Sequence, residues 1–200
     1  VDTQEIRMSW YIESLLPNAK MLTTLDLKSK SMAKDGISFD SIKEIILVCD
    51  ELKEANFEYL ANIDVDPDFF AENLTTKIEK LNISYIDILD EHMVKLLNRC
   101  KNITELDLLG CDLNHENGGL KHTEQRTLMA ISENLSQSLV KLQLPDDSFV
   151  YPGFLNSLPK LQYLWHQGQT PPATNPQDKT WIRSQFPQIS INEGNAQIAS

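Results

Sequence analysis

Apolar residues recur along the chain in triplets: a second apolar residue follows the first after three positions, and a third follows after two more. The five clear triplets are Leu22-Leu25-Leu27, Ile42-Ile45-Leu47, Ile78-Leu81-Ile83, Ile103-Leu106-Leu108 and Leu139-Leu142-Leu144. The last two residues of each triplet lie two positions apart, which is the period of a strand with one buried face. The triplets start 20, 36, 25 and 36 residues apart, and a repeat on that scale predicts a solenoid.

A further apolar column supports this repeat. Five positions after each triplet stands another apolar residue: Met32, Leu52, Ile88, Leu113 and Phe149. This is the eleventh position of the pattern LxxLxLxxN/CxL, which is typical of leucine-rich repeats. Two weaker triplets follow, at Leu161-Leu164-His166 and Phe186-Ile189-Ile191. The pattern therefore predicts six to seven strand units.

Segments with helical spacing of apolar residues fill the intervals between the predicted strands. We expect helices over 53–63, 90–99, 122–135 and 178–186, with Asp90 as the N-cap of the second. Parallel strands joined by helical crossovers place the strands on one side and the helices on the other. The sequence thus predicts an α/β fold: a leucine-rich repeat solenoid, shaped as a horseshoe arc, with a parallel concave sheet and convex helices.

The remaining segments set the domain organisation. Residues 20–192 form the predicted repeat domain, and 1–19 form an N-terminal helical cap or the end of a preceding repeat; the chain is then compatible with a fragment of a longer protein. Two polar stretches, 64–77 and 114–127, are interpreted as insertions, and 168–180 as a proline-rich loop. Residues 193–200 are interpreted as a C-terminal tail.

The composition limits the classes of partner and the cell compartment that we expect. The formal net charge of −11 argues against nucleic acid and anionic membrane surfaces, and it is compatible with a basic protein partner or with simple solubility. The sequence contains no apolar stretch of 18 or more residues, so it does not predict a membrane-spanning helix. The odd number of cysteines, three, favours a reducing compartment over a disulfide framework. We expect a cytoplasmic monomer, with secretion into a host cell by a pathogen as the alternative.

The segment NRCKNITELDLLGCDL (98–113) resembles the cysteine-containing leucine-rich repeat. In that subtype one Cys ends the helix and a second fills the ninth position of the next unit, and Cys100 and Cys111 stand in those places. These repeats are similar to those of the F-box substrate receptors of ubiquitin ligases. The resemblance implies a role in substrate recognition within a ubiquitin ligase.

Several clusters could hold a metal ion. Cys100, Cys111, His115 and His122 are of types that zinc accepts, but their spacing matches no common zinc pattern, and both cysteines have repeat positions. The acidic groups Asp64/Asp66/Asp68 and Asp146/Asp147 could bind calcium or form solvated loops, and we favour the loops. No phosphate loop or nucleophile elbow occurs. We therefore expect no enzymatic activity, no cofactor and no metal.

The third, fifth and seventh positions of each unit should face away from the core. They supply the predicted partner-binding residues: Glu44, Ile46, Lys80, Asn82, Glu105, Asp107, Leu109, Lys141, Gln143, Tyr163 and Trp165. Tyr163 and Trp165 are either interface hot spots or covered by the loop 168–180. The sequence predicts a non-enzymatic protein–protein interaction module acting through its concave face. The alternatives are a ubiquitin-ligase receptor and a pathogen effector.

Overall fold

A computed structural model describes residues 16–27, 39–58, 66–86, 88–111, 123–145, 150–165 and 180–192. Seven short strands form one parallel sheet whose order follows the chain: β1 (Thr24–Asp26), β2 (Glu54–Asn56), β3 (Lys80–Asn82), β4 (Glu105–Asp107), β5 (Lys141–Gln143), β6 (Tyr163–Trp165) and β7 (Ser190–Asn192). All neighbours pair in the same register, so equivalent residues of successive units lie side by side.

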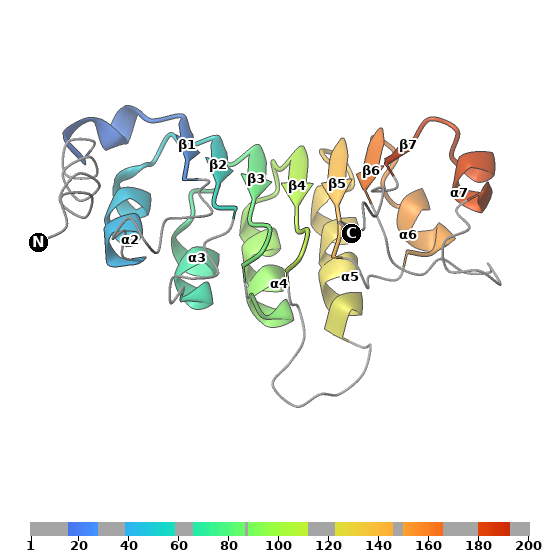
Figure 1. The fold of residues 1–200 in the computed structure, drawn as a ribbon, viewed down its shortest axis with the longest axis horizontal. Helices are drawn as coiled ribbons and strands as arrows, with labels where there is room; N and C mark the ends of the chain where they lie inside the picture. Colours follow the sequence, from blue (N-terminus) through green and yellow to red (C-terminus); the bar gives the residue numbers. More distant parts are fainter. Residues whose placement is uncertain are drawn as a thin grey trace, which may run out of the picture.

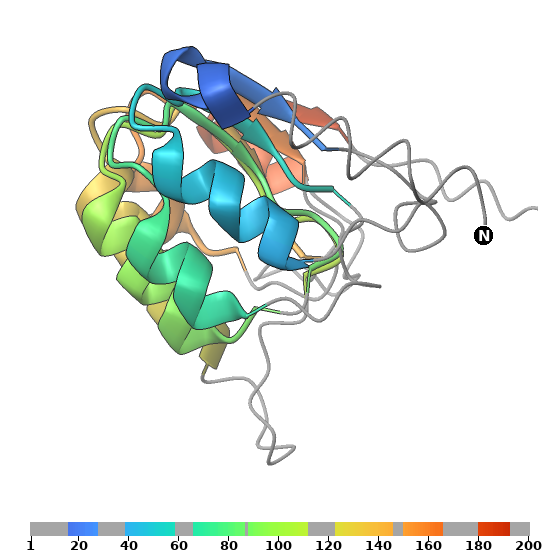
Figure 2. The ribbon, with the colours of Figure 1, turned by 90° about the vertical axis from the view of Figure 1, so that its left-hand side faces the viewer.

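Helices occupy the crossovers between the strands. After a 3-10 helix, η1 (Leu16–Met21), come α2 (Phe39–Val48), α3 (Pro67–Asn73), α4 (Asp90–Arg99), α5 (Thr123–Leu135), α6 (Pro152–Asn156) and α7 (Thr180–Gln185). The helices α2 to α6 lie on one side of the sheet (Figures 1 and 2). The predicted α/β fold with a parallel sheet is confirmed. Among the described residues, no helix is both long and apolar enough to cross a lipid bilayer.

The core lies between the sheet and the helices. The central residue of each strand from β1 to β6 is buried: Leu25, Ala55, Leu81, Leu106, Leu142 and Leu164. The residue two positions later is buried in the first five units: Leu27, Phe57, Ile83, Leu108 and Leu144. Each fully buried leucine or isoleucine contributes roughly 1.5–3 kcal/mol relative to an exposed one. The leucine positions therefore supply most of the sheet's share of the core.

In the second unit the strand lies at a different place from the predicted one. Residues 39–48 form the helix α2, so the triplet Ile42-Ile45-Leu47 is not a strand, and the predicted helix over 53–63 begins instead with β2. The strand positions belong to Leu52, Ala55 and Phe57, all buried. The centre of this strand has only the small buried side chain of Ala55. Two residues later, the Phe57 ring packs against the Phe70 ring of α3, with the ring centroids 4.9 Å apart.

The predicted insertion at 64–77 is also wrong, because it contains α3, the helix of an ordinary unit. Asp66 begins this helix by accepting a hydrogen bond from the backbone N–H of Phe69 at 3.2 Å. The last strand is shifted by two positions: Ile191, not Ile189, pairs with Leu164.

The helices predicted over 90–99, 122–135 and 178–186 are present as α4, α5 and α7, each within two residues of the expected ends. Four other predicted regions lie outside the described residues: 1–15, most of the insertion at 114–127, almost all of the loop 168–180, and the tail 193–200. Asp90 begins α4, but its N-cap is Leu89.

The turns after β3 and β4 each contain one residue with positive φ, at equivalent positions. These residues are Tyr85 (φ 59°) and Gly110 (φ 63°). A Cβ atom at Gly110 would overlap the Cδ1 and Cε1 atoms of the Tyr85 ring. Glycine is therefore required here both for the backbone conformation and for the close approach of the ring.

Replacing Gly110 by alanine should lower the free energy of unfolding by about 2 kcal/mol, because it adds left-handed strain and a clash. Urea unfolding of the purified variant measures this change. The matched control is Gly153→Ala in α6, where alanine suits the helix; its stability should stay within about 1 kcal/mol of wild type. Equal effects at both glycines would contradict the assigned turn.

Candidate functional site

The face of the sheet opposite the helices carries two rows of side chains. The first row precedes the central strand residue: Thr24, Glu54, Lys80, Glu105, Lys141 and Tyr163; the second follows it: Asp26, Asn56, Asn82, Asp107, Gln143 and Trp165. We call these two rows the outer face. The members of these rows on β1 to β5 line a shallow groove of about 270 Å³. A ligand in this groove would contact equivalent residues of five consecutive strands.

The first row contains an alternating ladder of charges. The Lys80 ammonium lies 3.0 Å from Glu54 and 3.6 Å from Glu105, and Lys141 lies 3.5 Å from Glu105. The hydrogen bond to Glu54, and then the nearby Glu105 charge, raise the pKa of Lys80. Each pair is partly exposed and weak by itself. Together they neutralise the centre of the row and orient its long side chains.

The second row supports the turns that follow the strands. The side-chain oxygen of Asn56 accepts from the Glu58 N–H at 3.1 Å, and that of Asn82 from the Ser84 N–H at 2.9 Å. The Asp107 carboxylate accepts from the Leu109 N–H at 3.0 Å. The predicted binding residues Asn82 and Asp107 therefore also hold the backbone of the outer face in place.

On β6 both rows carry an aromatic residue, and the register continues to Ser190 and Asn192 of β7. Tyr163 and Trp165 are both half-buried and lie beside Lys141 and Gln143 in the sheet register. Leu109, also half-buried, follows β4, and its carbonyl accepts the N–H of Tyr85 at 2.8 Å. The outer face thus changes from charged at β2–β5 to aromatic at β6.

The structure brings most of the predicted binding residues together, with two exceptions. Glu44 and Ile46 lie on α2: Glu44 is exposed there, and Ile46 is buried in the core. The residues that take their places are Glu54 and Asn56, which the sequence analysis missed. The spacing Leu52-Ala55-Phe57 was the signal that could have found them.

The seventh position does not always face outward. Ser84 is 2% exposed, with its hydroxyl donating to the Asn82 side chain at 2.6 Å, and Pro145 is also buried. Leu109 is the half-buried member of this column. After β3 and β5, therefore, only the third and fifth positions supply the outer face.

The cysteines take structural positions. Cys100 is fully buried and lies 3.6 Å from the Thr75 carbonyl, and burial raises the pKa of its thiol to about 11. Cys111 is buried as well, with its sulfur 3.1 Å from the Ile83 carbonyl. Neither environment favours a thiolate nucleophile. The candidate zinc residues His115 and His122 lie outside the described residues, and the part of the chain that the structure describes contains no cluster of three metal-binding side chains.

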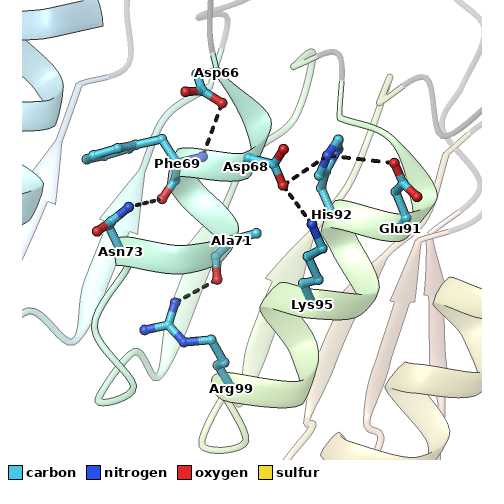
Figure 3. Close-up of polar contacts among 9 residues, drawn as sticks. All are labelled: Asp66, Asp68, Phe69, Ala71, Asn73, Glu91, His92, Lys95 and Arg99. Atoms are coloured by element: carbon cyan, nitrogen blue, oxygen red, sulfur yellow. Dashed lines mark hydrogen bonds and ion pairs between the residues drawn. The ribbon is translucent and has the colours of Figure 1, made fainter.

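Two residues of the candidate calcium group belong to the α3–α4 junction instead (Figure 3). Asp66 caps α3, and Asp68 lies 2.8 Å from the Lys95 ammonium and 3.2 Å from the Nε2 atom of His92. The Lys95 hydrogen bond holds the pKa of the Asp68 carboxyl below its usual range. Arg99 closes the other end of the junction by donating to the Ala71 carbonyl at 2.6 Å. These contacts join the neighbouring helices α3 and α4.

No family model and no curated protein sequence matches the chain. Among solved structures, the chain is similar to the tropomodulin C-terminal domain from Caenorhabditis elegans, with a TM-score of 0.50 and 18% sequence identity. The alignment covers 74% of this chain and 88% of that domain. At this level of identity the similarity shows a shared fold of alternating parallel strands and helices.

Proposed function

We propose that this chain is a short leucine-rich repeat solenoid that binds a protein partner through its outer face and catalyses no reaction. The observation that carries the proposal is the groove of about 270 Å³ lined by equivalent residues of β1 to β5. Further support comes from the leucine spacing and from the similarity to the tropomodulin C-terminal domain, whose fold is leucine-rich-repeat-like. The horseshoe arc belongs to this proposal, since such repeats curve with their strands inward.

The arrangement of the outer face suits protein recognition. Adjacent strands lie about 4.8 Å apart, so each row presents one side chain at each such step along the groove. The charge ladder restricts the side-chain conformations of Lys80, Glu105 and Lys141 before a partner binds. This restriction reduces the conformational entropy lost on binding. Tyr163 adds an aromatic side chain of the kind that dominates binding energy at interfaces.

A pair of triple variants tests the proposal. The outer-face variant combines Lys80→Ala, Lys141→Ala and Tyr163→Ala, and the control combines Lys101→Ala, Lys160→Ala and Met129→Ala at exposed positions away from the outer face. Proteins captured by wild type from the source cells are identified by mass spectrometry, and the affinity of a recovered partner is measured for all three chains. We expect binding to be at least about tenfold weaker for the outer-face variant and unchanged for the control.

Thermal unfolding of both triple variants accompanies the binding measurement, so that loss of structure is not mistaken for loss of contact. Full partner binding by a folded outer-face variant, or an equal loss in the control, would overturn the proposal.

A role in substrate recognition within a ubiquitin ligase is the second candidate. It is favoured by the two buried cysteines, with Cys100 immediately after α4 and Cys111 in the turn after β4, which match the cysteine-containing repeat. This role predicts that ubiquitin-ligase subunits are among the captured partners. Their absence from a capture that recovers other specific partners would remove this candidate and leave the binding function in place.

A further inference from the structure

The inner members of the charge ladder each lie between two charges of opposite sign. From β2 to β5 the ladder consists of Glu54, Lys80, Glu105 and Lys141. The Lys80 ammonium is 3.0 Å from the Glu54 carboxylate and 3.6 Å from that of Glu105. Glu105 in turn has the Lys141 ammonium 3.5 Å away on its other side. Lys80 and Glu105 are therefore compensated from both neighbouring strands.

The two ends of the ladder differ from its centre and from each other. Among the described residues, Glu54 forms an ion pair with Lys80 alone, and Lys141 forms one with Glu105 alone. The next residues of the row are neutral: Thr24 beside Glu54 and Tyr163 beside Lys141. The Glu54 side chain is 43% exposed and that of Lys141 is 41% exposed. The ladder thus has a negative end on β2 and a positive end on β5.

Both ends lie in the groove of the outer face. Glu54 and Lys141 are lining residues of that groove, and three strand steps separate β2 from β5. Neighbouring strands are about 4.8 Å apart, so the two ends are about 14 Å apart. A ligand in the groove therefore meets two opposite charges at a defined separation.

This separation suits an extended ligand better than a helical one. In an extended chain, residues four positions apart point to the same side and lie about 13 Å apart. In an α-helix, residues on one face are seven or eleven positions apart, which gives about 10.5 Å or about 16.5 Å. Electrostatic complementarity then requires a basic residue at Glu54 and an acidic residue at Lys141, because the reverse arrangement would bring like charges together.

We infer that the groove binds an extended segment of the protein partner that carries a basic residue over Glu54 and an acidic residue, four positions away, over Lys141. The inference rests on the proposed function, which it deepens by naming the conformation and the charges of the bound segment. Lys80 and Glu105 orient the two end groups and compensate each other between them.

Selection from a display library of random linear peptides on the purified wild-type chain tests the inference. Outer-face peptides are those that the outer-face triple variant no longer binds. We expect most of them to carry one basic and one acidic residue four positions apart. At low ionic strength, Glu54→Gln and Lys141→Gln should each weaken their binding by about threefold or more. Lys101→Gln, at an exposed position away from the outer face, is the control and should leave it unchanged.

Charge reversal tests each end separately. Selection on Lys141→Glu should replace the acidic residue of the peptides by a basic one, and selection on Glu54→Lys should replace the basic residue by an acidic one. Thermal unfolding establishes that both variants are folded.

Four results would overturn the inference: no peptide specific for the outer face, no preferred charge spacing, a spacing of seven or eleven residues, or the same peptides from wild type and the reversed variants. If any of these occurs while the outer-face triple variant still loses its protein partner, the extended charged segment is wrong and the proposed function stands.

Discussion

Replacing Leu106 by alanine should lower the free energy of unfolding by about 3–4 kcal/mol, whereas Glu105→Ala, one residue earlier, should change it by less than about 1 kcal/mol. Leu106 is 1% exposed at the centre of the sheet, between Leu81 and Leu142. Its removal leaves a cavity among side chains from both neighbouring units. Glu105 loses only partly exposed ion pairs.

Urea unfolding of both variants measures the difference, and Leu106→Met serves as the volume-conserving control, with an expected loss below about 1.5 kcal/mol. The partner-binding effects should be reversed, because only Glu105 belongs to the outer face. Similar destabilisation by the Leu106 and Glu105 alanine variants would contradict the alternation of buried and outward positions on which the candidate site depends.

The second large effect is expected at Asp90, where alanine should cost about 3 kcal/mol of stability. The carboxylate is 2% exposed and accepts from the N–H of Thr127 at 3.0 Å and from its hydroxyl at 2.5 Å. This contact joins the first residue of α4 to α5. Removing the Asp90 carboxylate leaves two buried donors, the backbone N–H and the hydroxyl of Thr127, without their acceptor.

A double-mutant cycle with Thr127→Val isolates the side-chain part of this contact, since valine keeps the backbone N–H. We expect a coupling energy of about 1–3 kcal/mol from thermal or urea unfolding. Asp40→Ala is the matched control: Asp40 is also acidic and in the first turn of its helix, but its side chain is 89% exposed, so its loss should stay below about 0.5 kcal/mol. Strict additivity of Asp90 and Thr127 would show that the bond contributes nothing.

The sequence pattern was sufficient where leucine occupied the central strand position, as at Leu81 and Leu106. It failed in the second unit for a physical reason. Four buried residues of this segment have the spacing of one helix face: Ile42, Ile45, Ile46 and Cys49. The first two of them also begin an LxxLxL triplet. The true strand has Ala55 at its centre, and Phe57, two residues later, packs on Phe70 of α3, the helix that follows this strand.

The candidate site was predictable to the same extent as the strand register. The pleat of a strand determines which residues face outward, so Lys80, Glu105 and Trp165 followed from the leucine positions. The hydrogen bonds that side chains of the outer face make did not follow from the leucine positions. Whether Asn82 holds the turn at Ser84, or Gln143 turns its amide toward Asp107, depends on groups that meet only after folding.

The sheet order from β1 to β7 equals the order of the strands in the chain. Each inner strand, from β2 to β6, therefore pairs with the strands of the preceding and following units. A whole strand–helix unit gained or lost at either end would change the length of the outer face by one strand width and leave every remaining pairing intact. Gene duplication could thus lengthen the binding groove stepwise without requiring a new topology.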